Sequence, residues 1–149
     1  MSALADVFLT NNRINIFVIE QLSDEQLNFA ANARARSIAD QLAHLHNVRL
    51  QWLEALRPAL VKSLKKMEKG VSKKELKAAL ESSAEAVAEL FRDVENGNAK
   101  GFRKGPETFF AYLIAHEAHH RGQVLLHLKN AGMPFDKMKS FKLWEWEKM

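Results

Sequence analysis

The residues of this chain best suited to chemistry are its six histidines, which fall in two short windows. The first window holds His44 and His46, and the second holds His116, His119, His120 and His127. Neutral imidazole is the commonest protein ligand for transition metals, which makes a metal site the first hypothesis. The alternative is that these are core or boundary histidines whose ring nitrogens are hydrogen-bonded to neighbouring groups.

The stretch AHEAHHRGQ at residues 115–123 supplies two candidate ligands on one helical face. Residues four apart on a helix lie above one another, so His116 and His120 can converge on one ion, whereas His119 points elsewhere. His127 falls on roughly the same face but about 10 Å further along the helix axis, too far for the same ion. A catalytic zinc ion normally has three protein ligands and one open position. The third ligand must therefore come from another helix.

The other window offers two candidates for that third ligand. His44 and His46 lie about 200° apart around a helix axis, so only one of them can face the site. His44 lies beside Leu45 on the apolar stripe, and His46 lies one turn from Leu42 and from Leu50. The pattern favours His44 only slightly, and His46 stays as the alternative.

Glu117 completes an HExxH pattern with His116 and His120. In zinc peptidases, the glutamate of that motif is the general base. A peptidase is disfavoured here because no protease-like domain accompanies so short a motif. Arg121 and Gln123 follow the second histidine and could contact a substrate or hold a metal ligand in place.

Ligand histidines usually donate their second ring nitrogen to an acceptor, and the first helix offers Asn11, Asn12 and Glu20 for that role. For Gly122, the interpretation we favour is that the missing side chain lets another helix approach closely.

Helical patterns dominate the chain and strand patterns are nearly absent. Apolar residues recur at helical spacing over residues 3–22, where the expected stripe includes Val7, and from residue 38 to a break at Pro58. Further helices are expected after a capping box of Ser72 with Glu75 and from Pro106 to about residue 130. Four amphipathic helices of this length predict an all-α four-helix bundle.

Shorter elements are expected between and after the four helices. Ser23 with Gln26 predicts a capped turn, and residues 59–69 are expected to form a short extra helix between the second and third long helices. The segment 96–105 reads as a loop. The tail at 136–149 carries two tryptophans, which we expect to pack back on the bundle.

Composition limits the class of protein. A chain of 149 residues with 47% hydrophobic and 27% charged residues fits one globular domain over residues 1–149. The absence of cysteine excludes disulfides and thiolate ligands. The N-terminal segment reads neither as a signal peptide nor as a membrane span, so a cytoplasmic protein with no membrane partner is expected.

The net charge of +4 does not indicate nucleic acid binding. Seven lysines are concentrated in residues 62–77, where no arginine or aromatic residue is interleaved for base contacts. A solvated face is the better interpretation, and no nucleic acid partner is expected.

LAHLHNVRLQWL, followed much later by HEAHHRGQ, resembles the DinB-like superfamily, which includes the YfiT-type metal-dependent hydrolases. The resemblance covers nearly the whole chain, and its most specific part is the HxxxHRGQ run from His116 to Gln123. His44 stands two turns before Trp52, as the first family histidine stands before a bulky residue. The resemblance therefore favours His44 as the third ligand, with His46 second.

This resemblance implies a bundle of up-down-down-up topology, a three-histidine site for zinc or nickel in a cleft between helices, and frequent homodimers. Iron or manganese are further options for the ion. Family members include transferases that use low-molecular-weight thiols such as bacillithiol or mycothiol. Two functions are therefore expected to compete: a metal-dependent thiol S-transferase or small-molecule hydrolase in detoxification or stress response, and a non-catalytic dimeric metal-binding stress protein with a structural or vestigial site.

Overall fold

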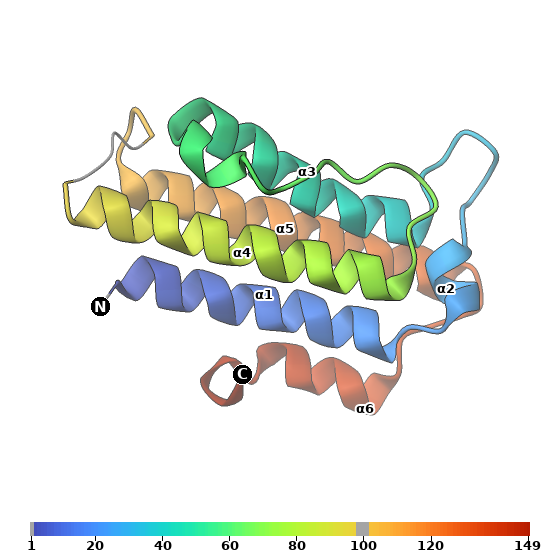
Figure 1. The fold of residues 1–149 in the computed structure, drawn as a ribbon. Helices are drawn as coiled ribbons and strands as arrows, with labels where there is room; N and C mark the ends of the chain where they lie inside the picture. The colour runs from blue at the N-terminus through green and yellow to red at the C-terminus, as the bar shows by residue number, and fades with distance from the viewer. Residues whose placement is uncertain (1, 98–101) are drawn as a thin grey trace.

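The computed structural model describes residues 2–97 and 102–149, and the described chain is built of helices without strands. Four long helices form the bundle: α1 (Ala3–Gln21), α3 (Ile38–Leu56), α4 (Lys73–Glu95) and α5 (Pro106–Asn130). In Figure 1, α1 and α5 run in one direction and α3 and α4 in the other. The up-down-down-up topology is therefore confirmed.

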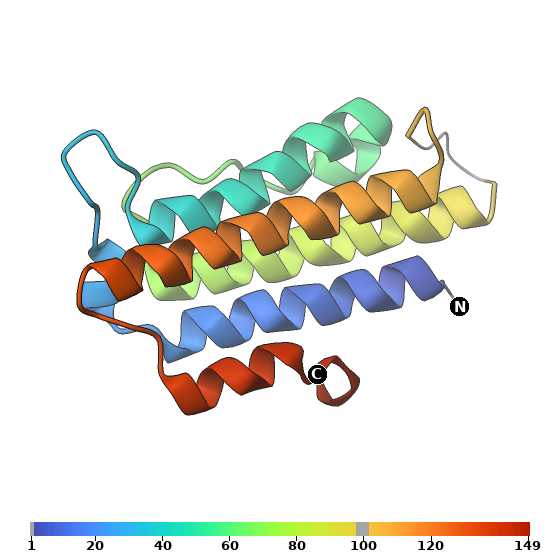
Figure 2. The ribbon, with the colours of Figure 1, turned by 180° about the vertical axis from the view of Figure 1, so that it is seen from behind.

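Each long helix packs against two others. α1 packs most closely on α4 and also contacts α5, and α3 packs on both α4 and α5. The view from behind in Figure 2 shows α3 and α5 side by side along most of their length. The two helices that carry all the histidines are therefore direct neighbours, although the whole of α4 separates them in the sequence.

The helices begin where the sequence provides capping side chains. Ser37 Oγ accepts a hydrogen bond from the amide of Asp40, and Ser72 and Glu75 form the expected capping box at the start of α4. Ser23 and Gln26 form a second capping box on the one-turn helix α2 (Asp24–Asn28). These caps satisfy amides that an α-helix leaves without partners in its first turn.

The core of the bundle consists of two apolar clusters with a layer of polar residues between them. One cluster lies where α1 and α5 end and α3 and α4 begin, and the other lies at the opposite end. We call the buried residues between them the polar layer: Asn11, Asn12, Asn15, Arg49, Ser83, Glu117 and Arg121. Phe8 takes the buried position expected of Val7, which is 42% exposed, so the expected stripe on α1 was wrong at this one residue.

The connection between α3 and α4 is less helical than predicted. The extra helix is only the short 3₁₀ turn η1 (Pro58–Val61), shorter than the expected 59–69. Side chains of α3 supply hydrogen bonds that a helix would otherwise make: Asn47 bonds both the amide and the carbonyl of Met67, at 2.8 and 3.0 Å. Asp40 accepts a further bond from the amide of Gly70 at 3.1 Å. α3 therefore fixes the path of this connection.

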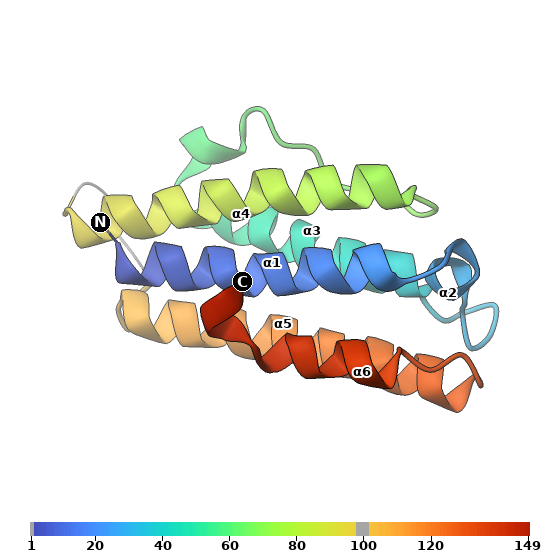
Figure 3. The ribbon, with the colours of Figure 1, turned by 90° about the horizontal axis from the view of Figure 1, so that it is seen from below.

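The C-terminal segment folds back along the bundle as α6 (Lys137–Ser140), η2 (Phe141–Trp144) and η3 (Trp146–Lys148). In Figure 3 it runs beside α1 and α5. Leu143 packs on an apolar cluster and Trp146 is half-buried, but Trp144 is 82% exposed. The prediction that both tryptophans pack back was therefore wrong for Trp144. No helix within the described ranges is sufficiently long and apolar to cross a bilayer.

Candidate metal centre

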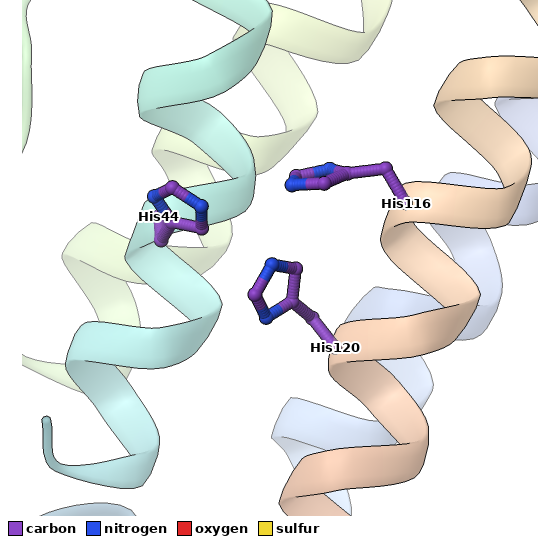
Figure 4. Close-up of side chains that lie close together, drawn as sticks. All are labelled: His44, His116 and His120. Carbon is purple, nitrogen blue, oxygen red and sulfur yellow. The ribbon is translucent and has the colours of Figure 1, made fainter.

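Three imidazoles meet between α3 and α5. His44 of α3 faces His116 and His120 of α5, and one ring nitrogen from each lies within 4.8 Å of the others (Figure 4). The ring centroids are 5.5 Å apart for His44 and His116, 4.9 Å for His44 and His120, and 4.6 Å for the two on α5. We call these three residues the histidine triad. The sequence predicted all three.

The triad has the chemistry of a site for a borderline-soft divalent ion. Nitrogens bound to one zinc ion at about 2.1 Å lie about 3.4 Å apart, so nitrogens as far apart as 4.8 Å would have to move closer for all three to bind. Nδ1 of His116 is buried and makes no hydrogen bond to any described residue. In Figure 4 the ring nitrogen of His116 that points toward the other two rings is the one farther from the chain, so Nδ1 is not the nitrogen that would bind an ion. The fit to a metal ion therefore rests on the donor set, three half-buried imidazoles that each offer one nitrogen within reach of the others.

The electrostatic environment keeps the triad neutral. Burial lowers the pKa of His44, and the nearby charge of Arg36 lowers it further. Burial also lowers the pKa of His116. For His120, burial and the adjacent His116 and His44 lower the pKa to about 4. All three rings are therefore unprotonated at pH 7, which is the form that coordinates a metal.

Two glutamine side chains hold the ring of His120. Nε2 of Gln41 donates to Oε1 of Gln123 at 2.7 Å and lies 3.5 Å from Nδ1 of His120. Gln41 is buried and Gln123 is half-buried. On the other side of the triad, the ring of Tyr112 stacks on that of His116, with centroids 6.0 Å apart. The expectation that Gln123 lies near a ligand is consistent with this placement.

Glu117 lies in the polar layer and not at the triad. Nε and Nη2 of Arg49 donate to its two carboxylate oxygens at 2.7 and 2.9 Å, and the amides of Asn11 and Asn15 donate to Oε2 at 2.7 and 2.8 Å. Burial raises the pKa of this carboxyl, but the charge and hydrogen bonds of Arg49 outweigh burial and hold the pKa below its usual value. A buried, fully hydrogen-bonded carboxylate has no access to a reacting water. The peptidase role is therefore unsupported.

Arg121 also belongs to the polar layer. Its Nη1 donates to the side-chain oxygens of Asn11 and Asn15 at 2.8 and 2.7 Å, and it is only 9% exposed. These contacts tie α5 to α1. Arg121 therefore has a structural role, and not the contact with a substrate that was considered from the sequence.

The remaining histidines lie outside the triad. The ring of His46 is buried against the other face of α3, with Nδ1 2.9 Å from the carbonyl oxygen of Ala79 and Nε2 2.8 Å from that of Lys65. The alternative third ligand is therefore fully occupied elsewhere. His119 and His127 are exposed. For His119, the spacing along the helix had predicted that it points away from the site.

Two lesser expectations were wrong. Asn11 donates to Glu117, Asn12 accepts a hydrogen bond from Arg49, and Glu20 pairs with Lys77. None of the three therefore supports a triad histidine. A side chain at Gly122 would meet nothing within 4 Å, so no helix approaches closely there.

Pockets flank the triad on both sides. One of about 220 Å³ has His120 in its wall, and another of about 190 Å³ has His44 in its wall. A larger hollow of about 540 Å³ lies between α1 and α4 and contains no triad residue. Each of the two smaller pockets therefore offers a ligand a route to one triad residue.

Comparison with known families identifies the group to which the protein belongs. The model described as the DinB family matches residues 1–148. The chain belongs to the DinB family. No curated protein and no solved structure matches the chain. DinB membership and the convergence of three histidines are consistent with a metal-binding protein.

Several residues that support this DinB centre were not identified from the sequence. Arg49 is buried between Leu45 and Leu53, each one turn away, so a charged residue on the apolar stripe of α3 was the available signal. Gln41 stands one turn before His44, on the face that meets α5. Arg36 borders both small pockets from the loop before α3, and no periodicity could have placed a loop residue there.

Proposed function

We propose that the histidine triad binds one divalent ion, zinc or nickel, with iron or manganese as alternatives, and that the protein is a metal-dependent enzyme acting on a small molecule. The observation that carries the proposal is the convergence of three neutral imidazole nitrogens from two helices within 4.8 Å of one another. The lowered pKa values of the three rings, which keep them unprotonated at neutral pH, support it further.

A divalent ion at this position would supply Lewis acidity, lowering the pKa of a water or thiol bound to it. The protein supplies the arrangement around it. His44, His116 and His120 hold three nitrogens in their unprotonated form, and Gln41 and Gln123 fix the ring of His120. The pockets beside His120 and His44 leave room for a substrate to approach from the open side of the triad.

Transfer of a low-molecular-weight thiol to an electrophile is the reaction we favour, and hydrolysis of a small molecule is the second option. Support for thiol transfer is the resemblance of the HxxxHRGQ run to family members with that activity. In this reaction the thiol loses its proton, its sulfur forms a bond to an electrophilic carbon, and the leaving group departs with the electron pair of the bond that breaks.

The test combines metal analysis with an activity screen. The purified protein is loaded with zinc or nickel, freed of excess metal and measured by plasma emission, with one ion per chain expected. It is then mixed with monochlorobimane and a panel of thiols that includes bacillithiol and mycothiol, and formation of the fluorescent conjugate is followed. Absence of metal in the loaded protein would contradict the whole proposal.

A structural or vestigial ion in a non-catalytic stress protein is the competing function. The two pockets beside the triad argue against it, because a structural zinc site is usually closed by four protein ligands. Stoichiometric metal without conjugate formation or hydrolysis for any substrate tested would favour this alternative.

We also propose a homodimer, which the family resemblance implies. Met138, Phe141 and Trp144 are 74%, 57% and 82% exposed on the C-terminal segment and would gain from burial against a second copy. Sedimentation equilibrium gives the mass directly, and a monomer at high protein concentration would contradict the proposal.

A further inference from the structure

The pocket next to His120 has a marked charge asymmetry. Its wall is formed by the loop before α3 together with residues of α3 and α5, and it contains both apolar and polar side chains. The polar members are Arg36, Gln41, His120, Gln123 and His127, and the apolar ones include Phe29 and Ile38. Among the residues that the structure describes, no carboxylate lines it, and Arg36 is the only one in its wall with a permanent charge, which is positive.

The side chain of Arg36 is available to a ligand. It is exposed, and it makes no hydrogen bond or ion pair within the part of the chain that the structure describes. Its charge contributes to lowering the pKa of both His44 and His120, which places it electrostatically close to two of the three triad residues. It also borders the second pocket beside His44. Arg36 therefore stands where both pockets approach the triad.

The loop that carries Arg36 has a defined conformation. The amide of Ile38 donates to the carbonyl of Phe29 at 2.9 Å, which closes the loop at its base. Within it, the side chain of Asn32 accepts bonds from the amides of Arg34 and Ala35 at 2.9 and 3.1 Å. Arg34 is exposed in the same loop but borders neither small pocket. The two arginines therefore differ in position relative to the triad and not in charge.

We propose that the pocket beside His120 selects small substrates with a carboxylate, and that Arg36 binds this carboxylate while another atom of the same substrate reaches the triad. A guanidinium group presents donors in a planar fork that matches the two oxygens of a carboxylate. A volume of about 220 Å³ is below the usual range for drug-sized ligands, so the substrate is small. The inference rests on the proposed metal-dependent function and adds its substrate class.

The experiment compares two thiols of nearly equal shape, mercaptopropionate and its neutral amide, mercaptopropionamide. Each is titrated calorimetrically into zinc-loaded protein at constant ionic strength, and the zinc content of every sample is measured. We expect the carboxylate to bind about tenfold more tightly than the amide or better, because a hydrogen bond to a charged group is stronger than one to a neutral group. Propionate, which lacks the thiol, shows how much of the affinity comes from the carboxylate end alone.

Three variants test whether the preference depends on Arg36. Arg36→Gln is expected to bind the two thiols about equally, and Arg34→Gln, which removes the same charge from the same loop, is expected to keep the wild-type preference. Arg36→Lys should prefer the carboxylate thiol over the amide by less than the wild type does but by more than Arg36→Gln does. Circular dichroism confirms that each variant is folded, which the exposure of both arginines leads us to expect.

The outcomes separate the two proposals. Protein that takes up no zinc contradicts the proposed function and removes this inference with it. Zinc-loaded protein that binds both thiols equally contradicts the carboxylate pocket alone. The same conclusion follows if Arg36→Gln and Arg34→Gln reduce the preference to the same extent, because the effect is then one of overall charge.

Discussion

Glu117 and His116 are neighbours in sequence, but they belong to polar regions of opposite character. In the polar layer, the carboxylate of Glu117 accepts four hydrogen bonds from Arg49, Asn11 and Asn15 and is 1% exposed. In the histidine triad, the three rings are half-buried, and Nδ1 of His116 has no hydrogen-bond partner among the described residues.

The difference separates groups that hold the fold from groups that await a ligand. A buried polar network with every member satisfied fixes the relative positions of its helices. Arg49 and Glu117 join α3 to α5 one turn or so from the triad, so the layer sets the register in which His44 meets His116 and His120. A cluster of neutral imidazoles whose nitrogens lie close together offers ligands for an ion instead.

The largest effect is expected from breaking the polar layer. Glu117→Gln leaves the buried guanidinium of Arg49 without a counter-charge and should lower the free energy of unfolding by about 3–5 kcal/mol. Urea unfolding followed by circular dichroism measures the loss, and an unfolded variant would be its extreme form. Glu89→Gln is the control, because Glu89 pairs with Arg92 at the surface and should lose less than about 1 kcal/mol. Equal losses in the two variants would show that the layer is not needed for stability.

Breaking the triad should change metal binding strongly and stability little. His120→Ala removes one of three ligands but no core contact, so metal content after loading should fall from one ion per chain to nearly none while metal-free stability changes little. Plasma emission and urea unfolding measure the two quantities. His127→Ala is the control, since its exposed ring lies two turns beyond His120 and outside the triad. Unchanged metal content in His120→Ala would refute the ligand assignment.

The next largest effect is expected from lowering the pH, which should destabilise the metal-free protein through the triad histidines. The triad histidines have lowered pKa values in the folded protein, with His120 at about 4, against about 6.5 in the unfolded chain. Between these values the unfolded chain binds more protons than the folded one, so metal-free stability should fall as the pH falls from about 6.5 towards 4. Urea midpoints at successive pH values measure this slope.

Metal retention provides the matching readout. Because burial lowers the pKa of all three rings, and that of His120 to about 4, protons compete less well for the ligands, so loaded protein should keep its ion near pH 6 and release it as the pH approaches 4. Gel filtration at each pH followed by metal analysis shows the release. An ion still bound below pH 4 would point to ligands other than histidine.

The smallest effect is expected at the support of His120. Gln123→Ala removes the acceptor that holds Gln41 beside the ring, and loss of such a contact typically weakens metal binding by about 10-fold or somewhat more. Competition with a chromogenic chelator measures the affinity. Gln51→Ala, on an exposed position of α3, should leave it unchanged. An unaffected Gln123→Ala would mean that the ring of His120 needs no such support.

Much of the fold could be predicted because its signals are local. Ser37, the Ser72 and Glu75 capping box, and Pro106 mark three helix starts that the structure confirms. The pairing of His116 with His120 follows from helix geometry alone. The choice of His44 over His46 does not, because it depends on which face of α3 meets α5, and the resemblance to the family decided it.

What the sequence could not supply depends on contacts between distant segments. Residues 62–72 are non-helical because side chains of α3, such as Asn47, bind their backbone. Trp144 is exposed because the path of the C-terminal segment, and not hydrophobicity, sets its direction. The partners of Glu117 come from α1 and α3, and only the assembled bundle shows that its carboxylate faces away from the histidines.

One triad imidazole comes from α3 and two come from α5, and the whole of α4 lies between these two helices in the sequence. A chain truncated before its last long helix would lack two of the three, and the last helix alone would lack the other. An ion held by all three would join two distant points of the chain, much as a disulfide does in a protein that has no cysteine. Metal loading would then protect the chain against proteases by restricting how far it can open.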